Sequence, residues 1–484
     1  MPPVPIPWPT NAMPGRWLGE GQGDLINAYA AKQGDIVRIR RMPGLKRYVT
    51  VPHGPGTYVP RGQFSFRDAR LLHAWSDSLR VYDGLVDMPV AGTLVGDEPV
   101  TFAANMRPAG PQTIVCGAEG PQIVNFGTAT IDPYPNQPAV TMATMETVEY
   151  HAGYFFFSKT SGEIWASDLQ SIDVPDGSVA YAQYMSDNLL RLKSTGTMLV
   201  ALGSASVEFF VDMGLSPFPL AQQGTLDVGL LGRWCVAGGV GEWEHGLLWI
   251  GSDCTVRMLQ GMQAPIVSTD DVARDIRVYL DHPELLRAQC YTFEQQAIWS
   301  ITSPTWTWEF NLITKAWHRR DSHHLPHWRV LWATRFKGRW HAQDMYKVCL
   351  QMIDMETFEE DGERMRFRCE SGPIKEFPAN FRIPSIDIDM TVGVGKTGRP
   401  SPYETEPVVM ISWSHNGGAN WANPVARSLG AEGRYSTKIT VNGLGRSTTQ
   451  GVRIRLDVTD PVLVSLQSGI STRTKGSRPR QVNQ

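Results

Sequence analysis

The sequence predicts an all-β protein built around a β-propeller of about seven blades, with six to eight compatible with the spacing. Seven units of an apolar run, a polar turn and a second apolar run carry this prediction. They begin at Leu71, Thr113, Tyr154, Met198, Leu247, Ala297 and Arg339. Successive starts differ by 42, 41, 44, 49, 50 and 42 residues, the period of propeller blades. The 46 Gly and 34 Pro suit many short strands joined by turns.

The clearest unit spans residues 154–168. An aromatic run from Tyr154 to Phe157 is followed by a polar turn at Ser161-Gly162 and then by a second apolar run. This pattern predicts a β-hairpin. Residues 286–320 contain four strand-sized runs, which is the content of one standard blade.

Changes in composition divide the chain into five segments. The predicted segments are an extended N-terminal arm (1–34), the β-propeller (35–355), a charge-rich junction (356–384), a C-terminal β-sandwich-like module (385–470) and a basic tail (471–484). The arm is assigned because its prolines lack backbone donors and suit a segment that lies over a surface. Five alternating runs separated by Gly-containing turns predict the sandwich.

Two further elements are predicted inside the propeller segment. Residues 36–41 alternate and form a strand that enters the first blade or closes the ring. Residues 270–287 are the best helical candidate, with Asp270 and Asp271 at the N-terminus and apolar residues at every fourth position. We expect this helix in a connection between blades.

Charge and cysteine usage narrow the function classes. Lys and Arg total 45 against 48 Asp and Glu, a formal charge of −3, which does not suit a protein that coats nucleic acid. The six cysteines are far apart and include no C-x-x-C pair, so we expect buried free thiols and assembly in a reducing cytoplasm. The N-terminus does not resemble a signal peptide, and no apolar stretch approaches the roughly 20 residues of a membrane helix.

Four motifs invite a chemical interpretation, and each has a simpler structural one. The run Gly393–Thr397 resembles a phosphate loop, but Met390 stands where the early glycine belongs, so a loop between strands is favoured. The histidines between His318 and His341 are interpreted as a solvated or interface loop sensitive to mild acid. The run 412–421 predicts a structural turn similar to an Asp-box. Alternating arginines in 38–41 and 364–368 predict a solvated face, or alternatively one that meets an acidic partner or DNA phosphate.

The sequence carries no recognisable catalytic signature. The patterns G-x-S-x-G and H-E-x-x-H are missing, and no carboxylate pair suited to glycoside hydrolysis can be assembled. We therefore expect no enzyme activity, no cofactor and no metal site.

Several stretches read in order resemble one family, the packaged-DNA stabilisation or tail hub (nozzle) proteins of short-tailed bacteriophages. The stretches are Arg41-Met42-Pro43-Gly44-Leu45, residues 203–210, Gly251-Ser252-Asp253, residues 256–259, 265–269 and 414–418, Leu429-Gly430, Gly443-Leu444-Gly445 and Thr459-Asp460-Pro461-Val462. The resemblance covers nearly the whole chain and rests on order and spacing.

The resemblance implies a structural protein of the virion tail, assembled in the host cytoplasm. It implies a ring of six copies below the portal and its head-to-tail adaptor, which continues the DNA channel until genome ejection, retains packaged DNA and docks tail spikes, fibres or a needle. DNA would pass without sequence-specific binding, and no membrane anchor is expected. The candidate interface residues are Trp8, Trp17, Arg38, Arg40, Arg41, His323, His324 and His327. The alternatives are a propeller glycan-binding or glycosidase protein of the virion and a cellular propeller scaffold.

Overall fold

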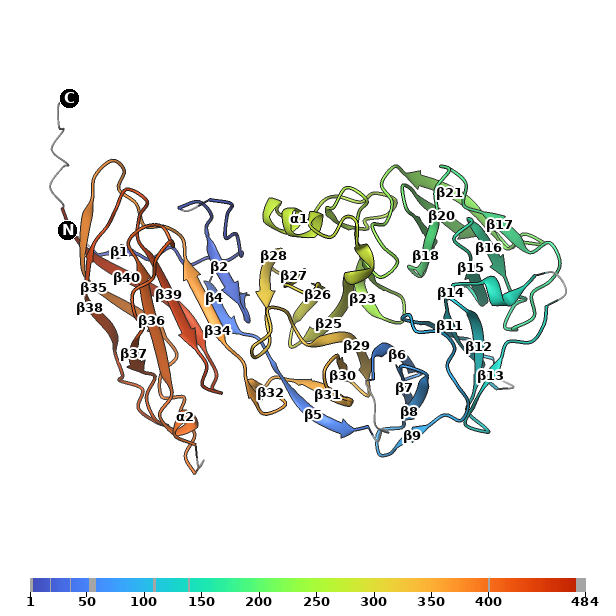
Figure 1. Ribbon diagram of the computed structural model, residues 1–484, viewed down its shortest axis with the longest axis horizontal. Helices are drawn as coiled ribbons and strands as arrows, with labels where there is room; N and C mark the ends of the chain where they lie inside the picture. The colour runs from blue at the N-terminus through green and yellow to red at the C-terminus, as the bar shows by residue number, and fades with distance from the viewer. Residues whose placement is uncertain are drawn as a thin grey trace.

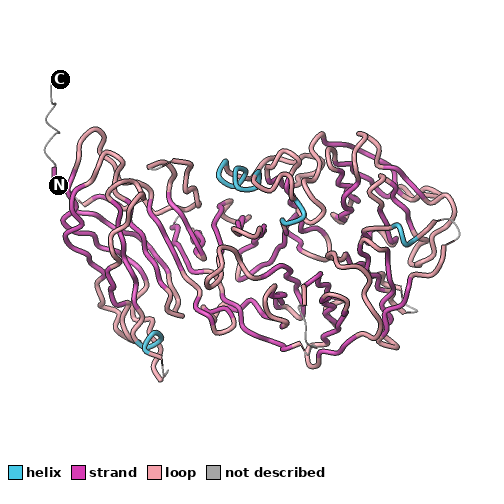
Figure 2. The backbone as a smooth tube through the Cα atoms, in the orientation of Figure 1, coloured by secondary structure: helices cyan, strands magenta, loops and turns pink. Residues whose placement is uncertain are grey.

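The structure is a computed structural model that describes residues 3–17, 19–34, 36–51, 58–107, 110–137, 140–398 and 401–475. Within these ranges the chain forms two modules, one at each end of an elongated molecule (Figure 1). Strands dominate both modules, and the connecting loops cover their rims (Figure 2). No helix of the described residues is long and apolar enough to cross a membrane.

The first module consists of successive antiparallel sheets, called blades here, which follow one another along the chain. Five of them use one continuous run each. Their strands are β6 (Pro60–Phe66), β7 (Arg70–Trp75), β8 (Ser78–Tyr82) and β9 (Asp87–Pro89); β10 (Thr101–Ala104), β11 (Thr113–Gly117), β12 (Gly120–Asn125) and β13 (Thr130–Pro133); β14 (Thr147–His151), β15 (Tyr154–Ser158), β16 (Glu163–Ala166) and β17 (Val179–Tyr181); β18 (Leu189–Ser194), β19 (Leu199–Gly203), β20 (Val207–Asp212) and β21 (Leu220–Leu226); β22 (Val236–Gly239), β23 (Trp243–Ile250) and β24 (Val256–Met258).

The last two blades include pairings with distant parts of the chain. Their strands are β25 (Arg287–Phe293), β26 (Gln296–Thr302), β27 (Thr307–Asn311) and β28 (Ala316–Arg320), and then β29 (Val330–Phe336), β30 (Arg339–Asp344) and β31 (Cys349–Asp354). The final blade is completed by β5 (Gly44–Thr50), which pairs antiparallel with β31. The hairpin of β32 (Glu359–Glu360) and β33 (Glu363–Arg364) extends the edge of β5.

The inner strands of neighbouring blades contact one another from β22 through the last and first blades to β18. At the remaining junction, Val240, which directly follows β22, donates its amide to the Ser194 carbonyl at the end of β18, at 3.0 Å. The first and last blades meet through β6 and β29. The sheets therefore close into a ring, which confirms the predicted propeller fold.

The hairpin at 154–168 shows why the aromatic run is continuous. β15 pairs with β16, with Phe157 opposite Trp165. Phe155 and Phe157 pack against the preceding blade, whereas Phe156 packs against the following one. Successive side chains of a strand point to opposite faces, and both faces of a blade are covered, so every position is apolar. All seven predicted units form such paired strands within separate blades.

The second module is a β-sandwich assembled from both ends of the chain. One sheet contains β1 (Val4–Pro5), β3 (Ala28–Gln33), β4 (Ile36–Arg41), β35 (Phe381–Met390), β38 (Ile439–Arg446) and β40 (Ser465–Lys475). The other contains β2 (Gly23–Ile26), β34 (Phe367–Ser371), β36 (Val408–Ser414), β37 (Val425–Ser428) and β39 (Arg453–Val458). β2 also pairs parallel with β28, so this second sheet continues without interruption into a propeller blade.

Three predicted elements differ from the structure. Residues 23–33, placed in the arm, form β2 and β3, because Leu25, Ala28 and Tyr29 are buried in the core. Strand 36–41 lies in the sandwich, and the next strand, β5, closes the ring. Residues 471–475, placed in the tail, belong to β40, while 476–484 lie outside the described residues.

The helical segments are short. They are α1 (Asp270–Arg277), α2 (Pro402–Thr405) and the 3-10 turns η1 (Met142–Thr144) and η2 (Pro283–Leu285). α1 lies in the predicted connection between blades, but it is capped by Thr269 and ends ten residues earlier than expected. Val272 and Ile276 are the apolar residues of the helix that reach the core. Leu280 is exposed, so no apolar contact stabilises a further helical turn. Pro283 then excludes a continuation.

Candidate functional site

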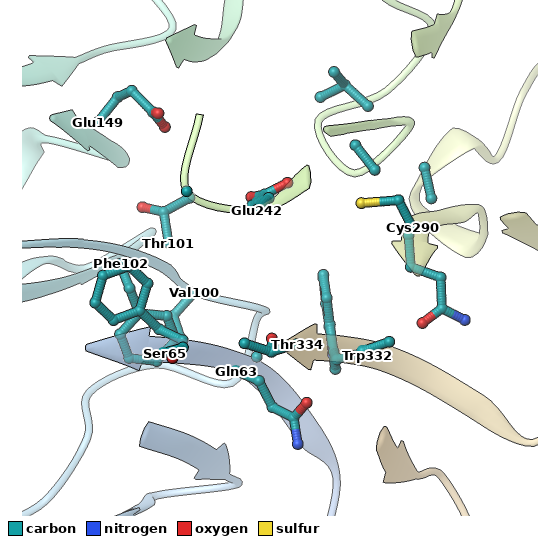
Figure 3. A pocket seen from close by; sticks show the side chains of 18 of the residues that line it. Gln63, Ser65, Val100, Thr101, Phe102, Glu149, Glu242, Cys290, Trp332 and Thr334 are labelled. Carbon is teal, nitrogen blue, oxygen red and sulfur yellow. The ribbon is translucent and has the colours of Figure 1, made fainter. Parts of the chain in front are cut away.

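One small cavity lies on the axis of the propeller, with a volume of about 80 Å³. All seven inner strands line it, through residues that include Gln63, Thr101, Glu149, Arg191, Val236, Gln289 and Thr334. Figure 3 shows Gln63, Glu149 and Glu242 around this space. Such a volume holds several water molecules. Buried polar atoms of Gln63, Arg191 and Gln289 have no partner among the described residues, which fits a hydrated cavity.

Four charged side chains meet beside the cavity. Lys193 pairs with Glu242, whose other oxygen accepts the Gly238 amide at 3.2 Å. Burial raises the pKa of Glu149 to about 7, and the nearby Glu242 adds to this shift. Burial would also raise the pKa of Glu242, but Lys193 and Arg191 outweigh it and hold that pKa below its usual range. Glu149 also accepts the Ser194 amide at 3.2 Å.

Two carboxyl groups with pKa values pushed apart are a pattern found in acid–base catalysis. The cavity here is far smaller than the roughly 300–1,000 Å³ of typical ligand pockets. A sugar unit does not fit between these groups. The cavity is also far too small for duplex DNA, whose major groove alone is about 12 Å wide. We therefore interpret the four charges as a balanced polar plug.

The propeller and the sandwich meet at a seam formed by residues 24–27, 41–45, 319–325, 364–368 and 457–462. Asn27 is fully buried there. Its side-chain amide donates to the Asp321 carboxylate at 2.7 Å and to the Arg366 carbonyl at 2.8 Å, and its side-chain oxygen accepts the Asp321 amide at 3.2 Å. Its backbone has φ of 50°, a conformation that asparagine tolerates better than most residues. One side chain thus joins the N-terminal segment, a blade and the start of the sandwich.

Arg41 holds the same seam from the other side. It is 1% exposed and donates to the carbonyls of Met365, Asp460 and Val462. Burial lowers the pKa of its guanidinium to about 9, against the opposing effect of Asp460. The charge is therefore held at an energetic cost, which the three carbonyls offset. Arg41 was predicted as an interface residue, and its burial inside the chain contradicts that prediction.

Ion pairs follow the sheet that runs from the blade into the sandwich. The pairs are Asp24–Arg319, Asp321–Arg366, Arg368–Asp457, Glu370–Arg453 and Glu370–Arg455. Arg368 binds Asp457 through two hydrogen bonds of 2.6 and 3.0 Å. The arginines of 364–368, predicted as one charged face, mostly serve these internal pairs. They stiffen the seam.

The tryptophans and basic residues predicted near the N-terminus have different surroundings. Trp8 is half-buried, with its indole nitrogen close to Gly469 of the same chain. Trp17 is 68% exposed. Arg40 is partly exposed and lies 3.7 Å from Glu294, and Arg38 is half-buried on the same strand. The segment before β2 thus lies largely on its own sandwich and blade; for example, the Ala12 amide donates to the Trp317 carbonyl.

The predicted histidine loop contains only two exposed histidines. His323 and His324 stack with ring centroids 3.9 Å apart in the connection between β28 and β29. His327 is 4% exposed and hydrogen-bonded to Tyr346, so its predicted interface role is wrong. His318 is buried against Glu309, and burial lowers the pKa of His341 to about 4. A pKa this low keeps His341 neutral in mild acid, contrary to the expectation for the whole cluster.

The two remaining motifs are loops. The amides of Gly393, Gly395 and Lys396 donate to carbonyls of the chain and are not directed at a phosphate. In the run 412–421, Asn416 accepts the Asn420 amide at 2.9 Å, and Arg455 stacks on Trp421. Both are structural turns, as predicted. All six cysteines lie in the described part of the chain, and they are buried free thiols, as predicted.

The topology defines a class of protein, a β-propeller fused through a shared sheet to a β-sandwich. Two family profiles match these modules in order. "Bacteriophage P22 Gp10, beta-propeller" matches residues 41–357, and "Bacteriophage P22 Gp10, beta-sandwich" matches residues 376–469. The chain belongs to the family of the bacteriophage P22 Gp10 DNA stabilisation protein. The predicted family resemblance is confirmed, and the chain is a structural protein of a short-tailed phage virion.

The other comparisons add little. No curated protein matches the sequence. The chain is similar to the WD40 β-propeller domain of Doa1, with 8% identity and a TM-score of 0.44 over 65% of this chain and 97% of that one. It is also similar to a chain of a mitotic checkpoint complex, with 13% identity and a TM-score of 0.43 over 67% and 95%. Scores this low carry no argument about function.

Proposed function

We propose that the chain is the repeating subunit of a tail hub ring of six copies, attached to the portal through a head-to-tail adaptor. The family membership supports this role. In such a ring, DNA passes through the hole framed by the copies, and the ring retains the packaged genome until ejection. Assembly takes place in the host cytoplasm before the ring joins a filled head.

The observation that carries the proposal is the plugged propeller axis. A cavity of about 80 Å³, crossed by charged side chains, gives DNA no path through one subunit. A DNA channel made from this protein must therefore be framed by several subunits. A near-neutral surface, with a formal charge of −3, suits such a channel because phosphates slide past it without strong attraction.

The shared sheet supports a load-bearing role. The nine strands from β25 to β37 form one continuous ladder across both modules. Asn27 joins a blade to the start of the sandwich, and Arg41 fixes the junction against the sandwich, so we expect the subunit to behave as one rigid body. The exposed candidates Trp17, His323 and His324, and the partly exposed Arg38 and Arg40, remain candidates for contacts with a neighbouring copy, the adaptor, or spikes, fibres or a needle.

DNA retention tests the proposal. Heads filled with DNA and carrying the adaptor, but lacking this chain, are expected to lose DNA on incubation. Adding the purified chain should restore protection of the genome from nuclease. Heads that keep their DNA without the chain, or that leak after the chain has bound, would contradict the proposed role.

We also propose that the chain performs no covalent chemistry, so purified chain should leave host-surface polysaccharide intact.

A further inference from the structure

The structure brings together two basic segments that are 40 residues apart in the sequence. His323 and His324 come from the loop between β28 and β29, whereas Arg364 and Arg366 come from β33 and the turn that follows it. These four side chains line one pocket of about 450 Å³ together with Asp321, Ser322, Leu325 and Thr459. The pocket, called the seam pocket here, lies between the propeller and the sandwich.

The carboxylate that lines this pocket is already paired within the chain. Asp321 is its single acidic lining residue among the described residues. Its carboxylate pairs with Arg366 and accepts the Asn27 amide at 2.7 Å. Burial raises the pKa of Asp321 despite the nearby arginines. With Arg364 and Arg366 against one carboxylate, the lining carries an excess of positive charge.

Arg364 is the group best placed to receive a ligand. Its guanidinium lies over the Tyr403 ring, with 3.7 Å between its central carbon and the ring centroid. Among the described residues, none accepts a hydrogen bond from its side chain, and the Asp460 carboxylate acts on it through space only. Stacking on an aromatic ring fixes the plane of a guanidinium and leaves its fork of donors directed outward. This fork matches the oxygens of a phosphate group.

The histidine turn faces the same space. His323 and His324 are exposed, and the Leu325 amide closes the turn on the Ser322 carbonyl at 3.0 Å. His324 has φ of 56°, where glycine or asparagine is the usual residue. The exposed Thr459 hydroxyl offers a neutral donor at the rim.

We propose that the seam pocket binds a phosphate group, held by Arg364 with His323, His324 and Thr459 as further donors. The phosphate comes either from a nucleic-acid backbone or from free phosphate in solution. The proposal does not depend on the ring, because the site lies within one copy of the chain.

The test uses the full-length chain and two probes, inorganic phosphate measured by calorimetry and a fluorescent 20-base-pair DNA duplex measured by anisotropy at low salt. Arg364→Gln should weaken phosphate binding about tenfold, as expected for the loss of a charge-assisted contact. The double variant His323→Gln/His324→Asn should also weaken it, and Asn suits the positive φ at 324. The exposed Arg107→Gln should bind like the unmodified chain.

The two probes separate the sources of phosphate. If the same variants weaken duplex binding and reduce its salt dependence by about one phosphate contact, the natural ligand is a nucleic-acid backbone. If only inorganic phosphate is affected, free phosphate is the ligand. Unchanged phosphate binding in both folded variants would overturn the proposal. Tighter binding of polyglutamate than of either probe, lost in the same variants, would also overturn it and assign the pocket to an acidic polypeptide.

Discussion

The blades between residues 101 and 226 and the seam are held together in different ways. Each of those blades is one continuous run, and clusters of apolar side chains join it to its neighbours. The seam joins residues hundreds of positions apart: Asn27 contacts Asp321 and Arg366, and Arg41 contacts Asp460. The blades rely on apolar burial, whereas the seam adds buried hydrogen bonds and ion pairs to an apolar core and a sheet that both modules share. The difference teaches that specific polar contacts between distant residues supplement the shared sheet in holding the modules together.

The largest effect is expected inside a blade. Phe156 is fully buried, with the Phe218 ring 5.9 Å away. Phe156→Ala should lower the free energy of unfolding by about 3–5 kcal/mol, because it leaves a cavity between two sheets. Denaturant unfolding followed by tryptophan fluorescence measures this loss. The exposed Leu169→Ala, in the same blade region, should cost less than about 1 kcal/mol.

Arg41→Ala should have the next largest effect, about 3 kcal/mol. It leaves the carbonyls of Met365 and Val462 without a donor in a buried site, and the Asp460 carbonyl with only the Val462 amide. Limited proteolysis should then release fragments of the sandwich before the propeller is cut, which Phe156→Ala should not do. Arg40→Ala, on the same strand but partly exposed, is the control and should cost less than about 1 kcal/mol. Equal proteolysis patterns for Arg41→Ala and Phe156→Ala would remove the distinction between blade and seam.

Asn27→Ala should cost about 2 kcal/mol, because three polar partners lose their hydrogen bonds. Asn27→Asp should be worse at neutral pH, since it places a second carboxylate beside Asp321 and removes the donor to the Arg366 carbonyl. Differential scanning calorimetry compares the two variants with Asn125→Ala, an exposed asparagine that serves a local turn. If Asn27→Asp were as stable as the unmodified chain, Asn27 would not be the proposed link.

The smallest predicted effect lies at the propeller axis and depends on pH. The folded-state pKa of Glu149 is about 7, above its ordinary value of 4.5, so the folded protein holds this proton more tightly than the unfolded chain. Stability from this group is fully present below about pH 4.5 and is lost as pH rises through 7. Glu149→Gln should therefore raise the free energy of unfolding by about 1 kcal/mol at pH 8, discounted for partial exposure, and change it little at pH 4.

Denaturant titrations at pH 4 and pH 8 measure that difference. The glutamine oxygen can still accept the Ser194 amide, so the substitution isolates the charge. The exposed Glu119→Gln should show no comparable difference between the two pH values. A larger stabilisation at pH 4 than at pH 8 would contradict the assigned direction of the pKa shift.

The same comparison explains what the sequence could predict. Hairpins such as 154–168 are visible because each blade is local in sequence and its apolar pattern reports burial on both faces. The sandwich strands of residues 408–414 and 453–458 were visible for the same reason. The roles of Asn27 and Arg41 could not be predicted, because the sequence does not distinguish a buried polar residue from an exposed one. Its partners lie in another module, and only the fold brings them together.

The seam pocket could be predicted in part. The histidine turn and the arginine run were each recognisable, but nothing in their spacing places them in one pocket. The arm at 1–34 was misjudged because its prolines suggested a segment without a core, while Leu25, Ala28 and Tyr29 supply one. Proline content therefore does not predict the strands that follow the proline-rich residues.

Native mass measurement of the full-length chain, alone and mixed with a purified portal–adaptor ring, tests the central proposal most directly. We expect six copies bound per adaptor ring, with any smaller species of the free chain shifting to that stoichiometry on mixing. A chain that stays monomeric and does not bind the adaptor ring would contradict the proposed hub.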